Sequence, residues 1–187
     1  LWTRDWDEIF NEKNKSLDSL VISQYSWDIL FHGHALNAKG ASWIAKLAVL
    51  CPELRFMFPF ARPNGFEASS NCFFIPCSWE SGLKEEIKKS RYVAVPSLWS
   101  APIEGALVKS IVCARGVIVA DNLSSFCDEL PKGLVLKISA IPKFAVQDLR
   151  NAIECNWLPD ERIKSAWISD FRNLQGNFVN KLLTLLV

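Results

Sequence analysis

The sequence predicts an α/β fold, a doubly wound parallel sheet of about six strands with helices on both faces. Three observations carry this prediction. Short, continuous apolar runs alternate with longer amphipathic stretches, which is the pattern of buried parallel strands joined by helices. Half of the 187 residues are hydrophobic, including 8 Trp and 12 Phe, so the chain can fill a packed core. One apolar run, at residues 92–95, passes through a proline-containing turn directly into a helix.

Six runs have the length and composition of buried strands. They are rich in β-branched and aromatic residues, and most of them end at a proline, a glycine or a polar turn. The predicted strands span residues 27–32, 54–58, 72–75, 92–95, 116–120 and 134–138.

Helical periodicity fills the intervals between these runs. Apolar residues recur there at spacings of three and four, and prolines or glycines mark the ends. The predicted helices span residues 41–51, 80–90, a stretch from 102 onward, 143–155, 159–174 and 178–185. Gly176 is expected to separate the last two helices. Residues 1–26 are expected to form a lead-in or linker segment, and residues 27–187 a single domain.

The charge pattern excludes a non-specific nucleic-acid binder. The 21 basic and 20 acidic side chains are mixed along the chain and leave a formal net charge of +1. Such a surface has no field that would hold a polyphosphate backbone. We therefore expect no nucleic acid among the partners.

The cysteines, histidines and apolar runs bear on metal binding and location. The six cysteines form no C-x-x-C pair and lie mostly in apolar runs, which indicates free thiols in a reducing compartment. No third ligand stands at a suitable spacing from His32 and His34, so we expect no metal site. No run approaches the ~20 apolar residues of a membrane span, and the first residues are too charged for a signal peptide. The expected location is the cytoplasm, without an integral membrane segment, and peripheral membrane contact in the full-length protein stays open.

Two aromatic residues and one histidine have a structural interpretation. In a chain with 8 Trp, core packing of Trp79 and Trp99 is the stronger expectation than stacking on a nucleobase. His32 lies within a buried strand and is expected to be a core residue.

Two loops are expected to form a binding site at the carboxyl edge of the sheet. The first follows the first strand and runs from Gly33 to Gly40. The second follows the fourth strand, where Pro96 stops the strand and Pro102 suits the first turn of the next helix. Helix N-termini after parallel strands are typical phosphate sites, because their unpaired N–H groups and the helix dipole favour an anion.

From residue 27 to its last helix, the chain resembles the C-terminal, donor-binding domain of retaining glycosyltransferases with the GT-B fold, the group 1 or family 4-like enzymes. The resemblance is carried by the glycine loop after the first strand, the Pro-Ser loop with its helix and strand at residues 92–120, and the Gly-Leu-Val strand and helix at residues 133–153. It implies a Rossmann-like half of a two-domain enzyme that binds a nucleotide-diphosphate sugar as donor substrate. It also implies no cofactor and no metal, and an N-terminal acceptor-binding domain outside this chain.

The resemblance implies roles for residues of the first loop. Gly33 and Lys39 match the family's phosphate-side loop, while His34 stands where the family has an arginine. Lys39 is expected to neutralise the leaving diphosphate as the glycosidic bond breaks. His34 would donate one hydrogen bond where a guanidinium makes a charged fork. Both residues are expected to be catalytic.

In the second loop the chain departs from the family pattern, because the family's paired glutamates fall on Ala101 and Lys109 in a gapless alignment. Glu104 is the carboxylate nearest to both positions and is expected to be a third catalytic residue, which orients the donor. Lys109 is expected to face the phosphates. The alternative for Glu104 is an acidic residue favoured in the first helical turn by the helix dipole. The predicted donor-binding residues are Gly33, Ser100, Ile103, Gly105, Lys109, Cys77 and Ser78.

Two functions of different classes follow from these residues. The first is a glycosyltransferase domain that transfers a hexosyl or deoxyhexosyl group, with retention, from a nucleotide sugar to a glycan or lipid-linked acceptor in polysaccharide or glycoconjugate synthesis. The alternative is a non-catalytic glycosyltransferase-like module that binds a sugar nucleotide, a glycan or a protein partner. Lys39 and Gly33 favour the enzyme, and the missing pair of glutamates favours the alternative.

Overall fold

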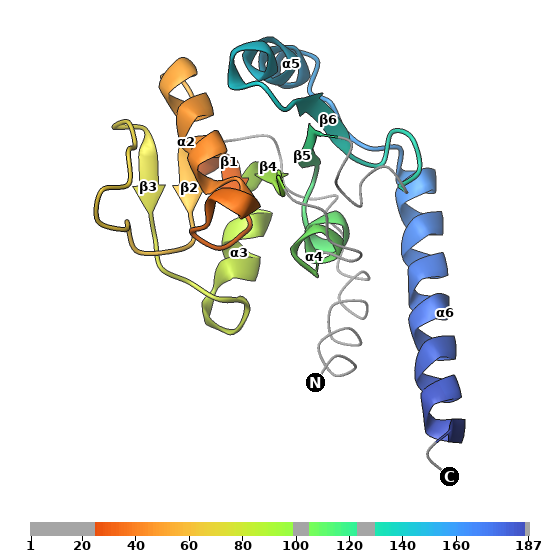
Figure 1. Ribbon diagram of the computed structural model, residues 1–187. Helices are drawn as coiled ribbons and strands as arrows, with labels where there is room; N and C mark the ends of the chain where they lie inside the picture. The colour runs from red at the N-terminus through yellow and green to blue at the C-terminus, as the bar shows by residue number, and fades with distance from the viewer. Residues whose placement is uncertain (1–24, 99–104, 123–129, 186–187) are drawn as a thin grey trace.

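A computed structural model describes residues 25–98, 105–122 and 130–185, and its centre is a six-stranded sheet in which every pair of neighbours is parallel (Figure 1). The predicted α/β class is confirmed. The strands are β1 (Trp27–Phe31), β2 (Phe56–Phe58), β3 (Cys72–Phe74), β4 (Ser90–Ala94), β5 (Val117–Asp121) and β6 (Leu136–Ser139).

The order of the strands is β3-β2-β1-β4-β5-β6, so the direction of winding reverses between β1 and β4. The chain first moves outward from β1 to β3, returns to lay β4 beside β1, and then moves outward on the other side. Ile29 of β1 lies between Phe56 and Tyr92 on the two neighbouring strands. In open parallel sheets, such a switch point leaves a crevice outside the carboxyl ends of the two central strands, where ligands bind.

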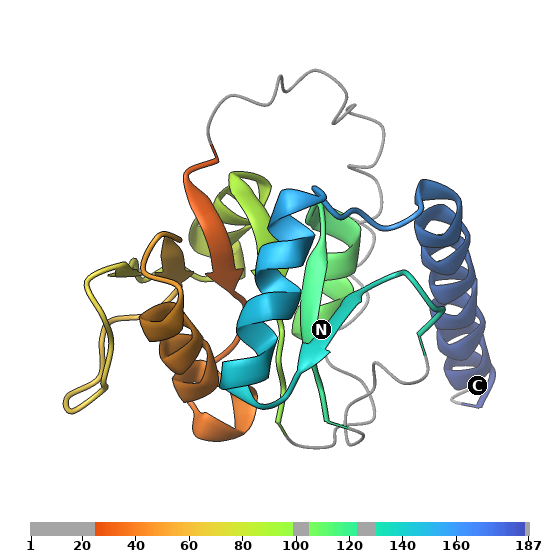
Figure 2. The ribbon, with the colours of Figure 1, turned by 90° about the horizontal axis from the view of Figure 1, so that it is seen from above.

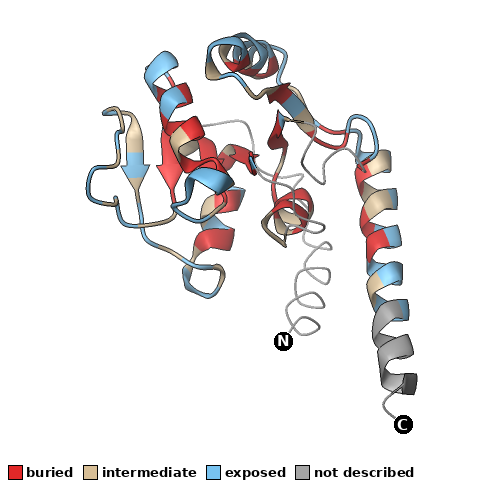
Figure 3. Ribbon diagram, in the orientation of Figure 1, coloured by how far each residue is buried: buried red, intermediate tan, exposed pale blue. Residues whose placement is uncertain are grey.

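Helices cover both faces of the sheet, because the side chains of each strand alternate between two buried layers (Figure 3). Helices α2 (Ala41–Leu50) and α5 (Pro142–Glu154) lie side by side on one face (Figure 2). Helices α3 (Leu83–Lys88) and α4 (Gly105–Cys113) cover the other face. The four inner strands β1, β2, β4 and β5 are therefore largely buried, as their apolar runs predict, whereas the edge strands β3 and β6 are partly exposed.

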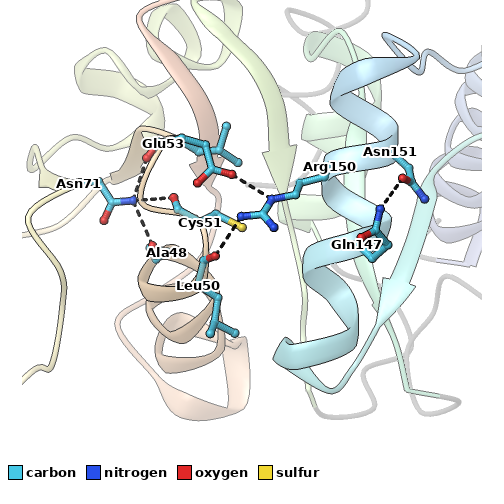
Figure 4. A network of polar contacts seen from close by, with 9 residues as sticks. Ala48, Leu50, Cys51, Glu53, Asn71, Gln147, Arg150 and Asn151 are labelled. Atoms are coloured by element: carbon cyan, nitrogen blue, oxygen red, sulfur yellow. Dashed lines mark hydrogen bonds and ion pairs between the residues drawn. The ribbon is translucent and has the colours of Figure 1, made fainter.

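A polar network fixes the C-terminal end of α2 (Figure 4). The side-chain amide of Asn71 donates to three main-chain carbonyl groups at this helix end, over 2.8 to 3.1 Å. The acceptors belong to Ala48, Cys51 and Leu54. The network thereby joins the segment before β3 to the turn that follows α2.

The predicted helix at residues 80–90 is wrong in its extent. Gly82 adopts a left-handed conformation with φ of 107°, which interrupts the helical run. A 3-10 helix, η4 (Trp79–Ser81), precedes this glycine and the six-residue α3 follows it. Ser90 already begins β4.

The predicted break at Gly176 is also wrong, because a single helix, α6 (Glu161–Leu185), runs through it. A glycine inside a helix costs about 1 kcal/mol relative to alanine but does not end the helix unless it takes a left-handed conformation. Gly176 is not among the glycines with positive φ. Ile168 and Phe171 attach α6 to Val108 of α4. Among the helices of the described chain, none combines the length and the apolar character needed to cross a membrane.

Candidate functional site

The loops that follow β1 and β4 are held against each other at the switch point. The main-chain N–H of Leu98 donates to the carbonyl of Ala38 over 2.8 Å. Gly40 has a left-handed conformation with φ of 86°, and a Cβ atom there would lie 2.5 Å from Cγ of Pro96. Position 40 therefore requires glycine for both its backbone angle and its packing. These contacts join the two loops for which the sequence predicts a ligand site.

The β1 loop carries three of the predicted site residues. His34 is exposed, and Lys39 is half-buried at the end of the 3-10 helix η3 (Asn37–Lys39). Gly33 lies two residues after the end of β1, and a Cβ atom there would lie 2.7 Å from the Phe31 ring. The β1 loop thus places one ammonium group and one imidazole at the carboxyl edge of the sheet.

A buried histidine connects the end of β1 to α4. Nδ1 of His32 and Oγ of Ser110 share a hydrogen bond of 2.8 Å, although 78 residues separate them. Both residues are buried, with exposed fractions of 8% and 0%. The prediction of His32 as a core residue is confirmed. The bond fixes the rotation of α4 relative to the strand that leads into the β1 loop.

The aromatic ring of Trp79 contacts His32 and two lysines. The imidazole of His32 is stacked on the indole, with ring centroids 6.3 Å apart and planes 9° from parallel. Nζ of Lys109 lies 4.5 Å from the ring centroid, and Nζ of Lys84 lies 5.9 Å from it. These are cation–π contacts. Trp79 therefore packs within the protein, as expected, and its ring holds the Lys109 ammonium group beside the first turns of α4.

Burial, together with smaller contributions from the nearby charges of Lys109 and His34, lowers the pKa of His32 to about 3. The imidazole is consequently neutral at physiological pH. Only a neutral ring is compatible with a buried position this close to an ammonium group. His32 thus contributes its shape and one hydrogen bond rather than a charge.

No residue in the described part of the chain packs closely beside the backbone at Gly105, where α4 begins. Gly105 is half-buried, and no described atom lies within 4 Å of the position that a Cβ atom would take. Lys109 follows one turn later on the same helix. The predicted site residues Ser100, Ile103 and Glu104 lie outside the described residues, together with Trp99, Ala101 and Pro102.

Cys77 and Ser78 lie in the connection between β3 and η4, and their main-chain N–H groups are already used. Cys77 donates to the carbonyl of Pro59 over 3.4 Å, and Ser78 donates to Oγ of Ser81 over 2.7 Å. Burial raises the pKa of the Cys77 thiol, with a further contribution from the charge of Glu86. A role of Cys77 and Ser78 in base recognition stays a prediction.

Sequence reasoning missed the partner of His32 and the contacts of Trp79. Ser110 gave one usable signal, since it is a polar residue between Leu107 and Ile111 on the buried face of a predicted helix. Such a residue needs a hydrogen-bond partner inside the protein. No pattern in the sequence identifies which residue is the partner, because the contact depends on strand order. In the described part of the chain, no group of three His, Cys, Asp or Glu residues could hold a metal ion.

Comparison with solved structures shows a Rossmann-like α/β fold that corresponds to one half of the GT-B architecture. The chain is similar to Anabaena HepE, whose structure was determined in complex with UDP and glucose, with a TM-score of 0.64 and 13% identity over 97% of this chain. It spans about half of HepE, 52% of that chain. It is also similar to the catalytic domain of the cholesterol-α-glucosyltransferase of Helicobacter pylori, with a TM-score of 0.51 and 15% identity over 79% of this chain and 98% of that domain.

Sequence comparisons add no closer relationship. No protein-family model matches the chain. No curated protein matches it either. At identities of 13% and 15%, the structural likeness establishes the fold, and the chemistry has to be argued from the residues at the carboxyl edge.

Proposed function

We propose that this chain is the donor-binding domain of a glycosyltransferase, with its site for a nucleotide-diphosphate sugar at the switch point between β1 and β4. The observation that carries the proposal is the joining of the β1 and β4 loops, through Leu98–Ala38 and Pro96–Gly40, at the place where ligands bind in sheets of this order. The structure of HepE with UDP and glucose gives the class of ligand to be tested.

Three residues of this edge suit a diphosphate. Lys39 and Lys109 supply ammonium groups, and His34 supplies an exposed imidazole that can donate a hydrogen bond. Charge-assisted hydrogen bonds to phosphate oxygens are the strong ones, and they stabilise a leaving diphosphate as its charge develops. In the proposed role, Lys39 and His34 neutralise the diphosphate while Lys109, supported by Trp79, holds a more distant phosphate oxygen.

The proposed reaction is transfer of a sugar with retention to a hydroxyl group of a glycan or lipid-linked acceptor. The bond between the anomeric carbon and the diphosphate oxygen breaks, and a new bond forms from that carbon to the acceptor oxygen. The acceptor proton leaves with the nucleoside diphosphate. The rest of a two-domain enzyme would bind the acceptor, Glu104 and Ser100 would orient the donor, and no metal or cofactor takes part in the proposal.

A second function, a non-catalytic module that binds a sugar nucleotide, glycan or protein partner, is favoured by one observation. Lys109, which stands where the resembling family has a glutamate, is engaged with the Trp79 ring at 4.5 Å. A cation there cannot accept hydrogen bonds from sugar or ribose hydroxyls. The two functions differ in turnover. The non-catalytic module binds its ligand without changing it, whereas the enzyme transfers the sugar when joined to its acceptor-binding part.

Calorimetric titration of the domain with UDP, GDP and dTDP, each alone and as a sugar conjugate, tests the proposal. We expect one nucleotide to bind and Lys39→Ala to raise its Kd by roughly 10- to 100-fold, the effect of removing one charge-assisted hydrogen bond. Lys46→Ala is the matched control, because Lys46 is exposed on α2 and its substitution removes the same charge at a position away from the carboxyl edge. Absence of binding at millimolar concentration, or equal losses in both variants, contradicts the proposal.

A further inference from the structure

The turn that follows β4 contains a serine in a backbone conformation that serine rarely adopts. Ser97 has a φ of 26° and is 3% exposed. A non-glycine residue held at such an angle stores about 1 to 3 kcal/mol of strain and persists only when its surroundings determine it. The residues around Ser97 must therefore hold the turn in place.

Asn122 supplies this support from the neighbouring strand. It directly follows β5, and its Nδ2 donates to the carbonyl of Ser97 over 3.0 Å. Its Oδ1 is buried and has no hydrogen-bond partner in the described structure. A buried acceptor without a donor is unfavourable, so the side chain is kept in this orientation by the bond that its amide makes to Ser97.

The turn held by Asn122 in turn contacts both neighbours of Lys39. Leu98, which follows Ser97, donates to the carbonyl of Ala38, and Pro96, which precedes Ser97, packs against Gly40. Residues 96–98 therefore bracket Lys39 on its two sides along the chain. A shift of the Ser97 carbonyl would be passed to the β1 loop through these two contacts.

We infer that Asn122 is a positioning residue, which holds the Ser97 turn and through it the loop that presents Lys39 to the ligand. The inference rests on the proposed function for the identity of the ligand. According to this inference, the residue that directly follows β5 supports the loop that would bind the phosphates, without contacting the ligand itself. Asn122 acts through Ser97 and is not itself a catalytic residue.

Two variants of Asn122 and one compensating change test the inference. Asn122→Asp keeps the shape of the side chain but replaces the donor by an oxygen that repels the Ser97 carbonyl, and Asn122→Ala removes the bond. Each is expected to raise the Kd for the bound nucleotide about tenfold, the effect of one lost hydrogen bond. Ser97→Gly in the Asn122→Ala protein relieves the strained angle and is expected to restore the Kd to within about threefold of wild type.

Hydrogen exchange of the Leu98 amide gives a readout that does not depend on a ligand. Faster exchange of the Leu98 amide in Asn122→Ala supports the positioning role of Asn122, and unchanged exchange overturns it. Asn71→Ala is the structural control, since Asn71 supports the opposite end of α2 and its loss is expected to lower stability without changing the Kd or the Leu98 exchange.

The outcomes separate the two proposals. If the wild-type protein binds none of the nucleotides, the proposed function fails and the Leu98 exchange alone decides the role of Asn122. If the wild-type protein binds and both Asn122 variants bind equally well, the positioning role is overturned while the proposed function stands. A loss of affinity in Asn71→Ala as large as in Asn122→Ala also overturns it, because a general loss of stability then explains both.

Discussion

Replacing His32 by asparagine is expected to reduce the loss of stability that the protein undergoes as the pH falls below 6.5. The pKa of His32 is lowered to about 3 in the folded protein by burial and by the charges of Lys109 and His34. In the unfolded chain the imidazole regains an ordinary pKa near 6.5. Between these two values the unfolded state binds one more proton than the folded state, so the free energy of unfolding falls as the pH falls.

The magnitude follows from the two pKa values. One pKa unit corresponds to about 1.4 kcal/mol, so the full difference is worth about 5 kcal/mol. The contribution of His32 to the free energy of unfolding is present in full well above pH 6.5, and about 2 kcal/mol of this contribution is lost at pH 5. Total stabilities of single domains are about 5 to 15 kcal/mol, so one histidine accounts for much of the expected acid sensitivity.

Urea unfolding at pH 7.5 and pH 5, followed by tryptophan fluorescence, measures this effect. Asparagine can place its amide near the position of the imidazole Nδ1 and keep a hydrogen bond to Ser110, but it does not titrate. His34→Asn is the matched control, because His34 is exposed and is the other of the two histidines. We expect the wild type and His34→Asn to lose about 2 kcal/mol more than His32→Asn between the two pH values.

The carboxylates with lowered pKa values, such as Glu53 and Glu86, also destabilise the fold in acid, but they contribute equally to all three proteins. The difference between the proteins therefore isolates His32. The reasoning is refuted if His32→Asn loses as much stability as the wild type, or if His34→Asn removes the pH dependence.

Two further changes have expected effects on the free energy of unfolding in the same assay at pH 7.5. Asn71→Ala leaves three carbonyl groups at the end of α2 without their side-chain donor and is expected to cost about 1 to 3 kcal/mol, whereas Asn64→Ala in an exposed loop is expected to change little. Gly40→Ala is expected to cost about 2 to 4 kcal/mol from its backbone angle and its collision with Pro96. Gly65 also has a positive φ, 73°, but no described atom lies within 4 Å of the position that its Cβ atom would take. Equal losses of stability in Gly40→Ala and Gly65→Ala would therefore contradict the packing argument.

The inner strands were predictable because they are largely buried on both faces and therefore read as apolar runs, and the partly exposed edge strands β3 and β6 still carry aromatic and β-branched residues. Their order was not predictable, since β1 and β4 are neighbours in space although two strands lie between them in the chain. The two errors in the helices both concern glycine. Gly82 takes a left-handed angle and ends a helical run, while Gly176 stays within one, and the sequence alone does not show which backbone angle a glycine adopts.

The candidate site was predictable as two loops, but the way in which they are joined was not. The strand-end positions of Gly33 and Lys39 follow from local sequence. The bonds that hold these loops, from Asn122 to Ser97 and from Leu98 to Ala38, link distant segments and exist only once the sheet has formed. Such contacts leave no periodic pattern in the sequence, and they join two separate loops into one candidate site.

The central claim, that a nucleotide binds at the switch point, is tested most directly by recording the amide spectrum of the isotope-labelled domain during separate titrations with UDP, GDP and dTDP. The account predicts that the largest shifts occur at Gly33, Lys39 and Gly105, at the carboxyl ends of β1 and β4. If all three nucleotides leave these amides unmoved at millimolar concentration, or shift only residues at the β3 edge of the sheet, the claim is contradicted.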